Sequence, residues 1–180
     1  EKELDRINTL VQNLLKITKL DAGSIVLEKK PEDVAEMMNN VELRFSYRAE
    51  QEQKKLVLFG EEDIFLSCDR DWILEAVDNI VKNAMDHTKS GDTIEIKWRK
   101  SASIVQIQIK DNGSGIHPED LHHIFKRFYR SRFSKDQQGI GLGLPLAKMI
   151  IEAHNGTIEV NSELGKGTMF IISFLIPTKL

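Results

Sequence analysis

Two stretches of alternating residues, DTIEIKWRK at 92–100 and IVQIQIKDNG at 104–113, constrain most strongly what this chain can fold into. Their apolar positions are Ile94, Ile96 and Trp98 in the first, and Val105, Ile107 and Ile109 in the second. Successive side chains of a strand point to opposite faces, so the alternation predicts two strands with one buried face and one solvated face. A sheet of this kind needs a covering layer on its apolar side.

Helical spacing of apolar residues predicts that covering layer, most clearly in a helix from about 71 to 87. Its buried stripe consists of Ile73, Ala76, Val77, Ile80 and Ala84. Further helices are predicted before Gly23, from Pro31, just after Pro118 and from the glycines near 140 to His154. Further strands are predicted at 24–29, 56–59, 64–68, 157–162 and 168–176. The sum is an α+β fold, a two-layer α/β sandwich whose mixed, mostly antiparallel sheet of about five strands carries about three helices on one face.

Composition narrows the class of protein. With 180 residues and a formal net charge of -3, the chain can bury a real core and is a poor candidate for general nucleic-acid binding. Its one cysteine, Cys68, cannot form an intrachain disulfide, which fits a cytoplasmic location. It has neither a signal peptide nor an apolar run of ~20 residues. Because it starts inside a helical pattern without Met, we expect a fragment of a longer protein.

The stretch GIGLGLP at 139–145 places three glycines where a helix should begin. Each glycine has an entropic cost, which suggests that something approaches the bare backbone there, and a phosphate is the usual reason. The G-x-G-x-G spacing of this stretch is not a dinucleotide-binding fingerprint. The later stretch GKGT at 165–168 is not a P-loop either, because it lacks the earlier glycine.

Polar side chains flank the predicted core at two further places. Asp111 falls on the apolar face of its strand and is followed by two glycines, which fits either a ligand-binding carboxylate or an Asx turn. Asn79, Asn83 and Asp86 form one polar stripe on the 71–87 helix, beside its apolar stripe. Such oxygens suit Mg²⁺, although an ordinary polar helix face has the same pattern.

The segment from 125 to 135 interleaves aromatic and basic residues. It could stack single-stranded nucleic acid, it could form a lid that brings positive charge to a phosphate, or it could be a solvated loop.

The order of these features is more specific than any one of them. An asparagine-bearing helix, DNGSGI, IFKRFYR, GIGLGLPLAK and GKGT follow one another as the corresponding boxes do in the ATP-binding domain of sensor histidine kinases, which the chain resembles. That resemblance implies a Bergerat-type fold shared with gyrase, chaperone and MutL ATPases. It places the catalytic ATP-binding domain at residues 29–180. It makes residues 1–28 the C-terminal end of a dimerisation and phosphotransfer hairpin, closing in Leu-Asp-Ala-Gly.

The resemblance also implies roles for individual residues. Asn83 would ligate the Mg²⁺ of Mg-ATP, Asp111 would accept a hydrogen bond from the adenine amino group, and Arg130 would reach the terminal phosphates. Arg130 and Asn79 are the implied catalytic residues. Asp86 departs from the pattern of this family, which often has a phosphate-binding Lys at that position. The implied cofactor-binding residues are Asn79, Asn83, Asp86, His87, Asp111, Gly113, Gly115, Ile116, Tyr129, Arg130, Gly139, Gly141, Leu142, Gly143, Leu144 and Thr168.

The function implied is transfer of the γ-phosphoryl of ATP to a histidine, and then onward to a response regulator receiver domain. The parent would be a homodimer anchored in the bacterial inner membrane, with this part in the cytoplasm and no nucleic-acid partner.

None of the five histidines stands in an acceptor box before residue 30, so we expect the acceptor to lie on a helix absent from this chain. We interpret His117, His122, His123 and His154 as capping and surface residues.

Three other functions remain open, and one of them is a nucleic-acid-binding module that uses the basic and aromatic segment. An ATPase of the same superfamily would need a general base four residues before Asn83, but that position is Asn79, and Glu75 lies a turn too early. A protein-serine kinase has similar core boxes, although the hairpin-like residues 1–28 and the IFKRFYR segment argue against it.

Overall fold

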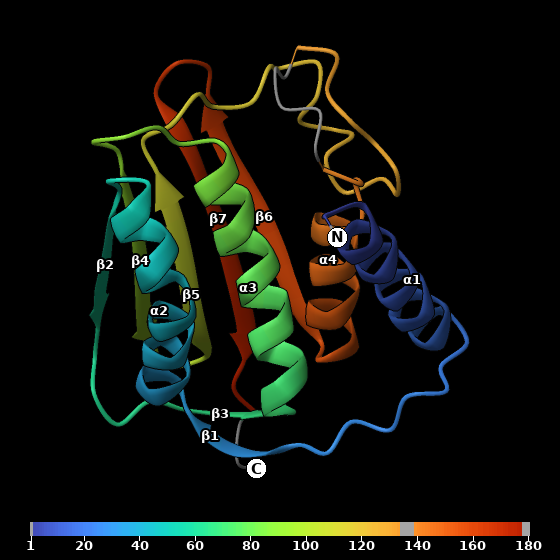
Figure 1. Cartoon of the computed structure of the whole chain (residues 1–180). Helices are drawn as coiled ribbons and strands as arrows, with labels where there is room; N and C mark the ends of the chain where they lie inside the picture. The colour runs from blue at the N-terminus through green and yellow to red at the C-terminus, as the bar shows by residue number, and fades with distance from the viewer. Residues whose placement is uncertain (1, 134–138, 178–180) are drawn as a thin grey trace.

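The sheet predicted from the alternating stretches is the centre of the computed structural model, which describes residues 2–133 and 139–177 (Figure 1). Its strands lie in the order β2 (Lys55–Gly60), β4 (Thr93–Lys100), β5 (Ile104–Asp111), β7 (Gly167–Leu175) and β6 (Gly156–Glu163). The β2–β4 pair is parallel and the other three pairs are antiparallel. The sheet is therefore mixed and mostly antiparallel, as predicted.

Helices α2 (Val34–Gln51), α3 (Arg70–Asp86) and α4 (Gly143–Ala153) lie side by side on one face of this sheet (Figure 1). All five members of the predicted α3 stripe are buried, and Ile96 and Ile109 face them from paired positions of β4 and β5. The core thus lies between the helical layer and the alternating strands. The two-layer sandwich is confirmed.

Three details of the predicted elements are wrong. Residues 24–29 form no strand, because the Glu28 N–H donates to the Asp69 carboxylate at 2.9 Å instead of to a neighbouring strand. Pro31 does not begin a helix. It lies in β1 (Lys30–Asp33), which pairs with β3 (Phe65–Cys68) in a separate two-stranded sheet, where an edge position tolerates proline. Helix α2 starts at Val34 because the Asp33 side chain caps it, accepting from Glu36 N–H at 3.2 Å.

The third wrong detail concerns the segment after Pro118, which forms successive turns and no α-helix. Its backbone bonds run to the third residue before the donor, as from Asp120 to His117 and from His123 to Asp120. The segment stays in turns because the Asp120 side chain is engaged by residues further along the chain, which are described below.

Helix α1 (Lys2–Asp21) packs against α4 at the edge of the helical layer (Figure 1). Ile17 is buried at this junction, and ion pairs join Lys16 to Glu75 at 2.9 Å and Asp21 to Arg127 at 2.7 Å. The N-terminal part of its apolar stripe, from Leu4 to Leu15, remains largely exposed. No helix of the described residues is long and apolar enough to cross a membrane.

His154, at the C-cap of α4, is buried and is not the surface residue we expected. Its Nε2 accepts the Asp69 N–H at 3.1 Å, and its Nδ1 lies 2.8 Å from the Ile150 carbonyl oxygen. This pair of contacts requires a neutral ring with the proton on Nδ1. Burial accordingly lowers the pKa of His154.

Acid should therefore destabilise the fold through His154. The unfolded ring takes up a proton near pH 6.5 and the folded ring does so only at lower pH, so the contribution of the neutral ring is complete above about pH 6.5 and is lost below it. One such proton gives a limiting slope of about 1.4 kcal/mol per pH unit. Thermal unfolding of His154→Gln between pH 8 and 5 should show a shallower decline than that of the wild type. The exposed His122→Gln variant is the control, and equal slopes for all three proteins would contradict the assignment.

Candidate functional site

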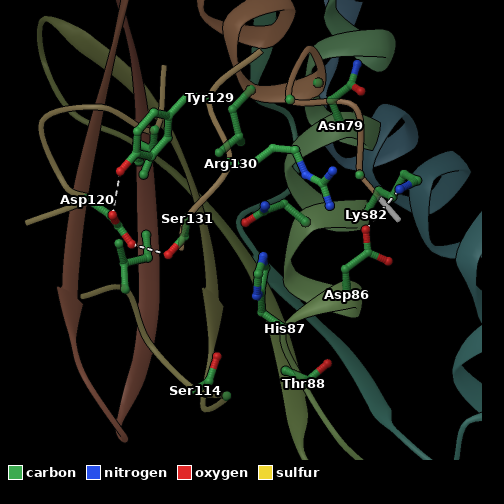
Figure 2. Close-up of a pocket in the computed structure, with 18 of the residues that line it drawn as sticks. Asn79, Lys82, Asp86, His87, Thr88, Ser114, Asp120, Tyr129, Arg130 and Ser131 are labelled. Atoms are coloured by element: carbon green, nitrogen blue, oxygen red, sulfur yellow. Dashed lines mark hydrogen bonds and ion pairs between the residues drawn. The ribbon is translucent and has the colours of Figure 1, made fainter. Parts of the chain in front are cut away.

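A cavity of about 1070 Å³ lies where the C-terminal half of α3, the loop after β5 and the start of α4 meet (Figure 2). Fourteen of the sixteen residues selected from the sequence line it. These are Asn79, Asn83, Asp86, His87, Gly113, Gly115, Ile116, Tyr129, Arg130, Gly139, Gly141, Leu142, Gly143 and Leu144. The two that do not line it are Asp111 and Thr168, which lie paired on β5 and β7. The fold thus brings distant segments of the chain to one place.

The α3 wall of the cavity follows from the three-and-four spacing of its polar residues. Asn79 donates to the Glu75 carbonyl oxygen at 2.9 Å, which fixes the amide so that its Oδ1 faces Gly143 at the start of α4. The Asp86 carboxylate is held by two cations, Arg48 at 2.7 Å and Lys82 at 2.9 Å. The amide oxygens of this wall suit a hard cation.

Helix α4 begins at the cavity with Leu142 as its N-cap residue, which provides no side-chain cap, and its first turn contains no acidic residue. The free N–H groups and the helix dipole there favour an anion. Gly141, just before it, has φ +77, and a Cβ at this position would lie 2.6 Å from the Tyr129 carbonyl oxygen. A side chain at 141 would therefore force apart the two ends of the segment between Tyr129 and α4. The glycine stretch combines an open helix N-terminus with a close backbone contact.

The loop after β5 presses directly against the end of α3. A Cβ on Gly113 would lie 2.2 Å from the carbonyl oxygen of His87, so only glycine fits between them. Asp111, 4% exposed, lies behind this loop, and its Oδ1 accepts the Gly113 N–H at 2.9 Å. Burial raises the pKa of Asp111, while the bond from the Gly113 N–H group opposes that rise. The carboxylate therefore supports the loop and leaves other lone pairs free for a donor.

Ser162 is a residue that the sequence analysis missed. Its hydroxyl lies 2.9 Å from that of Thr168 and accepts the Ile116 N–H at 2.8 Å, so it joins the β6–β7 hairpin to the loop after β5. Nothing in the local sequence marks it, because it is one serine in a strand. Its role depends on the hairpin register, which pairs Ser162 with Thr168.

A second missed group fixes the basic and aromatic segment. Asp120 accepts hydrogen bonds from the hydroxyls of Tyr129, at 2.5 Å, and Ser131 (Figure 2). Burial works to raise the pKa of Asp120, but these two hydrogen bonds outweigh it and the pKa is lowered. Phe133 stacks on His117 with ring centroids 3.9 Å apart. These contacts anchor the segment on both sides of Arg130.

Arg130 extends from this segment across the cavity toward Lys82 and Asp86 on α3 (Figure 2). In residues 2–133 and 139–177 no carboxylate lies within ion-pair distance of its guanidinium. Helix α1 also reaches the cavity and contributes Arg6, Thr9 and Asn13 to its wall. The α1 residues could not be recognised from the sequence, because the docking of α1 against α4 depends on tertiary structure.

Together these features can hold a ligand that is anionic at one end and flat at the other. Arg130, Lys82 and the α4 N-terminus bring positive charge to one side, beside the asparagine amides. The glycines of the β5 loop and the buried Asp111 lie on the other. Within the described parts of the chain, no group of three His, Cys, Asp or Glu side chains could hold a metal ion unaided.

Comparison with known proteins agrees with this geometry. The family model "Histidine kinase-, DNA gyrase B-, and HSP90-like ATPase" matches residues 68–178. Sensor protein SrrB of Staphylococcus aureus is 36% identical over 177 residues, which are 97% of this chain and 30% of that protein. The chain thus spans about 30% of the length of the curated relatives it matches.

Two solved structures share the fold. The histidine kinase ThkA, in a complex with the response regulator protein TrrA, matches with TM-score 0.79 and 25% identity over 97% of this chain and 48% of that one. Full-length ShkA in complex with AMPPNP matches with TM-score 0.85 and 24% identity over 96% of this chain and 36% of that one.

Proposed function

Because this chain belongs to the family of histidine kinase-, DNA gyrase B- and HSP90-like ATPases, we propose that it is the catalytic, ATP-binding part of a sensor histidine kinase. Residues 29–180 bind Mg-ATP, and its γ-phosphoryl passes to a histidine on a dimerisation helix outside this chain. The observation that carries the proposal is the convergence of Asn83, Arg130 and the uncapped α4 N-terminus on one cavity. The 36% identity to a sensor protein over nearly the whole chain supports the kinase in preference to its superfamily relatives.

The nucleotide lies with its adenine toward the β5 loop and its phosphates toward α4. Gly113 and Gly115 let the base lie against the backbone, and Asp111 accepts from its amino group. The N–H groups at 143 and 144 and the Arg130 guanidinium bind phosphate oxygens. Phosphoryl transfer requires mainly positioning and charge stabilisation, which these groups can supply.

The donor set fits magnesium that arrives with the nucleotide. Mg²⁺ usually keeps several waters and binds through substrate phosphates plus one or two protein oxygens. Asn83 offers an amide oxygen on the cavity wall beside the phosphate region, while Asn79 is already oriented by its bond to Glu75. We assign Asn83 as the protein ligand. The metal would neutralise charge on the phosphates.

The partners follow from the same proposal. The phosphoryl group goes from the acceptor histidine to a response regulator receiver domain, and the solved complex of ThkA with TrrA supports this step. Residues 1–28 belong to the dimerisation hairpin of a homodimeric parent, which is anchored in the inner membrane and presents this part to the cytoplasm. We propose no nucleic-acid partner.

The alternative is an ATPase or a serine kinase of the same superfamily, and the surroundings of Glu75 argue against the ATPase. Glu75 forms an ion pair with Lys16 and is not among the cavity-lining residues. Asn79 occupies the position of the general base, and an amide cannot accept a proton at neutral pH.

We therefore expect tight Mg-ATP binding with very slow hydrolysis. Calorimetric titration should detect binding of Mg-ATP, and steady-state phosphate release should stay well below a rate on the order of 1 s⁻¹. Asn79→Glu would introduce a carboxylate at the base position and should raise the hydrolysis rate, while Glu75→Gln should leave it unchanged. Rapid phosphate release by the wild type would contradict the kinase and favour the ATPase. Failure to bind Mg-ATP would contradict both.

A further inference from the structure

A chain of alternating charges connects the end of α2 to the cavity. Lys54 pairs with Glu52 at 2.5 Å, Glu52 with Arg48 at 2.7 Å, Arg48 with Asp86 at 2.7 Å, and Asp86 with Lys82 at 2.9 Å. The far end is fixed, since the Lys54 side chain is 7% exposed and also donates to the Met85 carbonyl oxygen at 2.6 Å. The near end, Lys82, is 59% exposed and lines the cavity.

Asp86 occupies the centre of this arrangement, and both of its carboxylate oxygens are in use. Oδ1 accepts from Arg48 and Oδ2 from Lys82. The two cations partly neutralise this carboxylate, which makes it a weaker ligand for a further cation. Arg48 is itself held by Glu52, so Asp86 is well placed to orient Lys82.

Lys82 lies one residue before Asn83 on α3 and lines the same cavity as Arg130, whose guanidinium extends toward this side of α3 (Figure 2). An ammonium group has three N–H donors, and the bond to Asp86 occupies one of them. The other two can bind phosphate oxygens. The i,i+4 pairing also restrains a side chain that would otherwise lose considerable rotamer entropy on binding.

We propose that Lys82 is the cation that binds the outer phosphates of the nucleotide from the α3 side, and that Asp86 positions it through their ion pair. The proposal rests on the proposed function, because it assigns the outer phosphates to the region between Lys82 and Arg130. It gives Asp86 a role that does not require metal coordination. In this arrangement Lys82 supplies the positive charge on α3, which Asp86, as an acid, cannot supply.

The test compares ATP with AMP, which lacks the outer phosphates. Lys82→Gln should weaken Mg-ATP binding about tenfold, the size of one charge-assisted contact at a partly exposed site, and should leave AMP binding unchanged. Lys82→Arg should restore most of the ATP affinity, because it retains the charge. Lys97→Gln is the matched control, since Lys97 is an exposed lysine on the sheet face opposite the helices. Melting temperatures of the variants check that the fold is intact.

Failure of this inference and failure of the proposed function give different results. If the wild type binds Mg-ATP and Lys82→Gln matches Lys97→Gln, Lys82 makes no phosphate contact and the inference is overturned while the function stands. An equal loss for ATP and AMP also overturns it. If the wild type binds no Mg-ATP, both are overturned.

A double-mutant cycle tests the positioning role of Asp86. Asp86→Asn should weaken ATP binding in the wild-type background and have no further effect in the Lys82→Gln background, because it acts through Lys82. Additive losses would show that Asp86 acts on the nucleotide or its metal independently, which overturns the positioning role.

Discussion

Incubated alone with γ-labelled ATP, this chain should remain unlabelled, whereas a separately produced dimerisation hairpin carrying an acceptor histidine should become labelled in the same mixture. Transfer of the γ-phosphoryl requires an acceptor in line and a few ångströms away. The groups proposed to hold the nucleotide all belong to the compact domain around the cavity. They should therefore act on an acceptor supplied by another polypeptide.

The chain's own histidines are poorly placed to replace that acceptor. His122, His123 and His154 are not among the cavity-lining residues, and His154 is buried with both ring nitrogens engaged. His117 stacks on Phe133. His87 lies against Gly113, at the end proposed for the adenine, away from the phosphates.

The measurement is acid-labile label on each polypeptide after separation. Asn83→Ala should reduce transfer to the hairpin to background, since it removes the proposed magnesium ligand, whereas the charge-altering surface variant Lys97→Gln should not. Stable self-labelling of the chain, on a histidine, serine or threonine, would show that the acceptor assignment is wrong.

Most of the fold could be predicted from local patterns in the sequence. The alternation from Ile94 to Trp98 and the α3 stripe depend on burial against a single opposing layer, and such burial leaves its period in the sequence. The start of α2 was predicted three residues early, because Pro31 is common both in a first helical turn and at a strand edge. Whether Pro31 begins a helix or lies in an edge strand depends on pairing with β3, which lies more than thirty residues away in the chain.

In the candidate site, too, some features are visible in the local sequence and others depend on tertiary structure. Glycines before a helix and amides on one helical stripe are local patterns, and the sequence analysis selected them. Asp120 and Ser162 act through hydrogen bonds to residues that reach them only after folding. The ion-pair chain from Lys54 to Lys82 is also tertiary, because it joins the end of α2 to α3. Surface charges of this kind leave no periodic signal, so Lys82 could not be distinguished from any other exposed lysine.

Asp111→Asn should weaken ATP binding by about 1–3 kcal/mol, or roughly 5- to 150-fold, because it removes a hydrogen-bond acceptor at a buried position. The carboxylate already accepts from the Gly113 N–H group, and the proposed adenine amino group would be a second donor. An amide has one oxygen and an NH₂ group that cannot accept, so one of the two donors loses its partner. The loss should be divided between nucleotide affinity and the stability of the loop.

Inosine triphosphate separates these two effects, because it carries an oxygen where adenine has its amino group. The wild type should bind ATP more tightly than inosine triphosphate, since Asp111 would face an acceptor in the latter. In Asp111→Asn the amide can donate to that oxygen, so this preference should collapse or reverse even if the variant is less stable. Asp78→Asn, the same chemical change at a carboxylate paired with Arg44 outside the cavity lining, should keep the wild-type preference. If Asp111→Asn also keeps the preference, the carboxylate supports the loop at Gly113 and does not read the base.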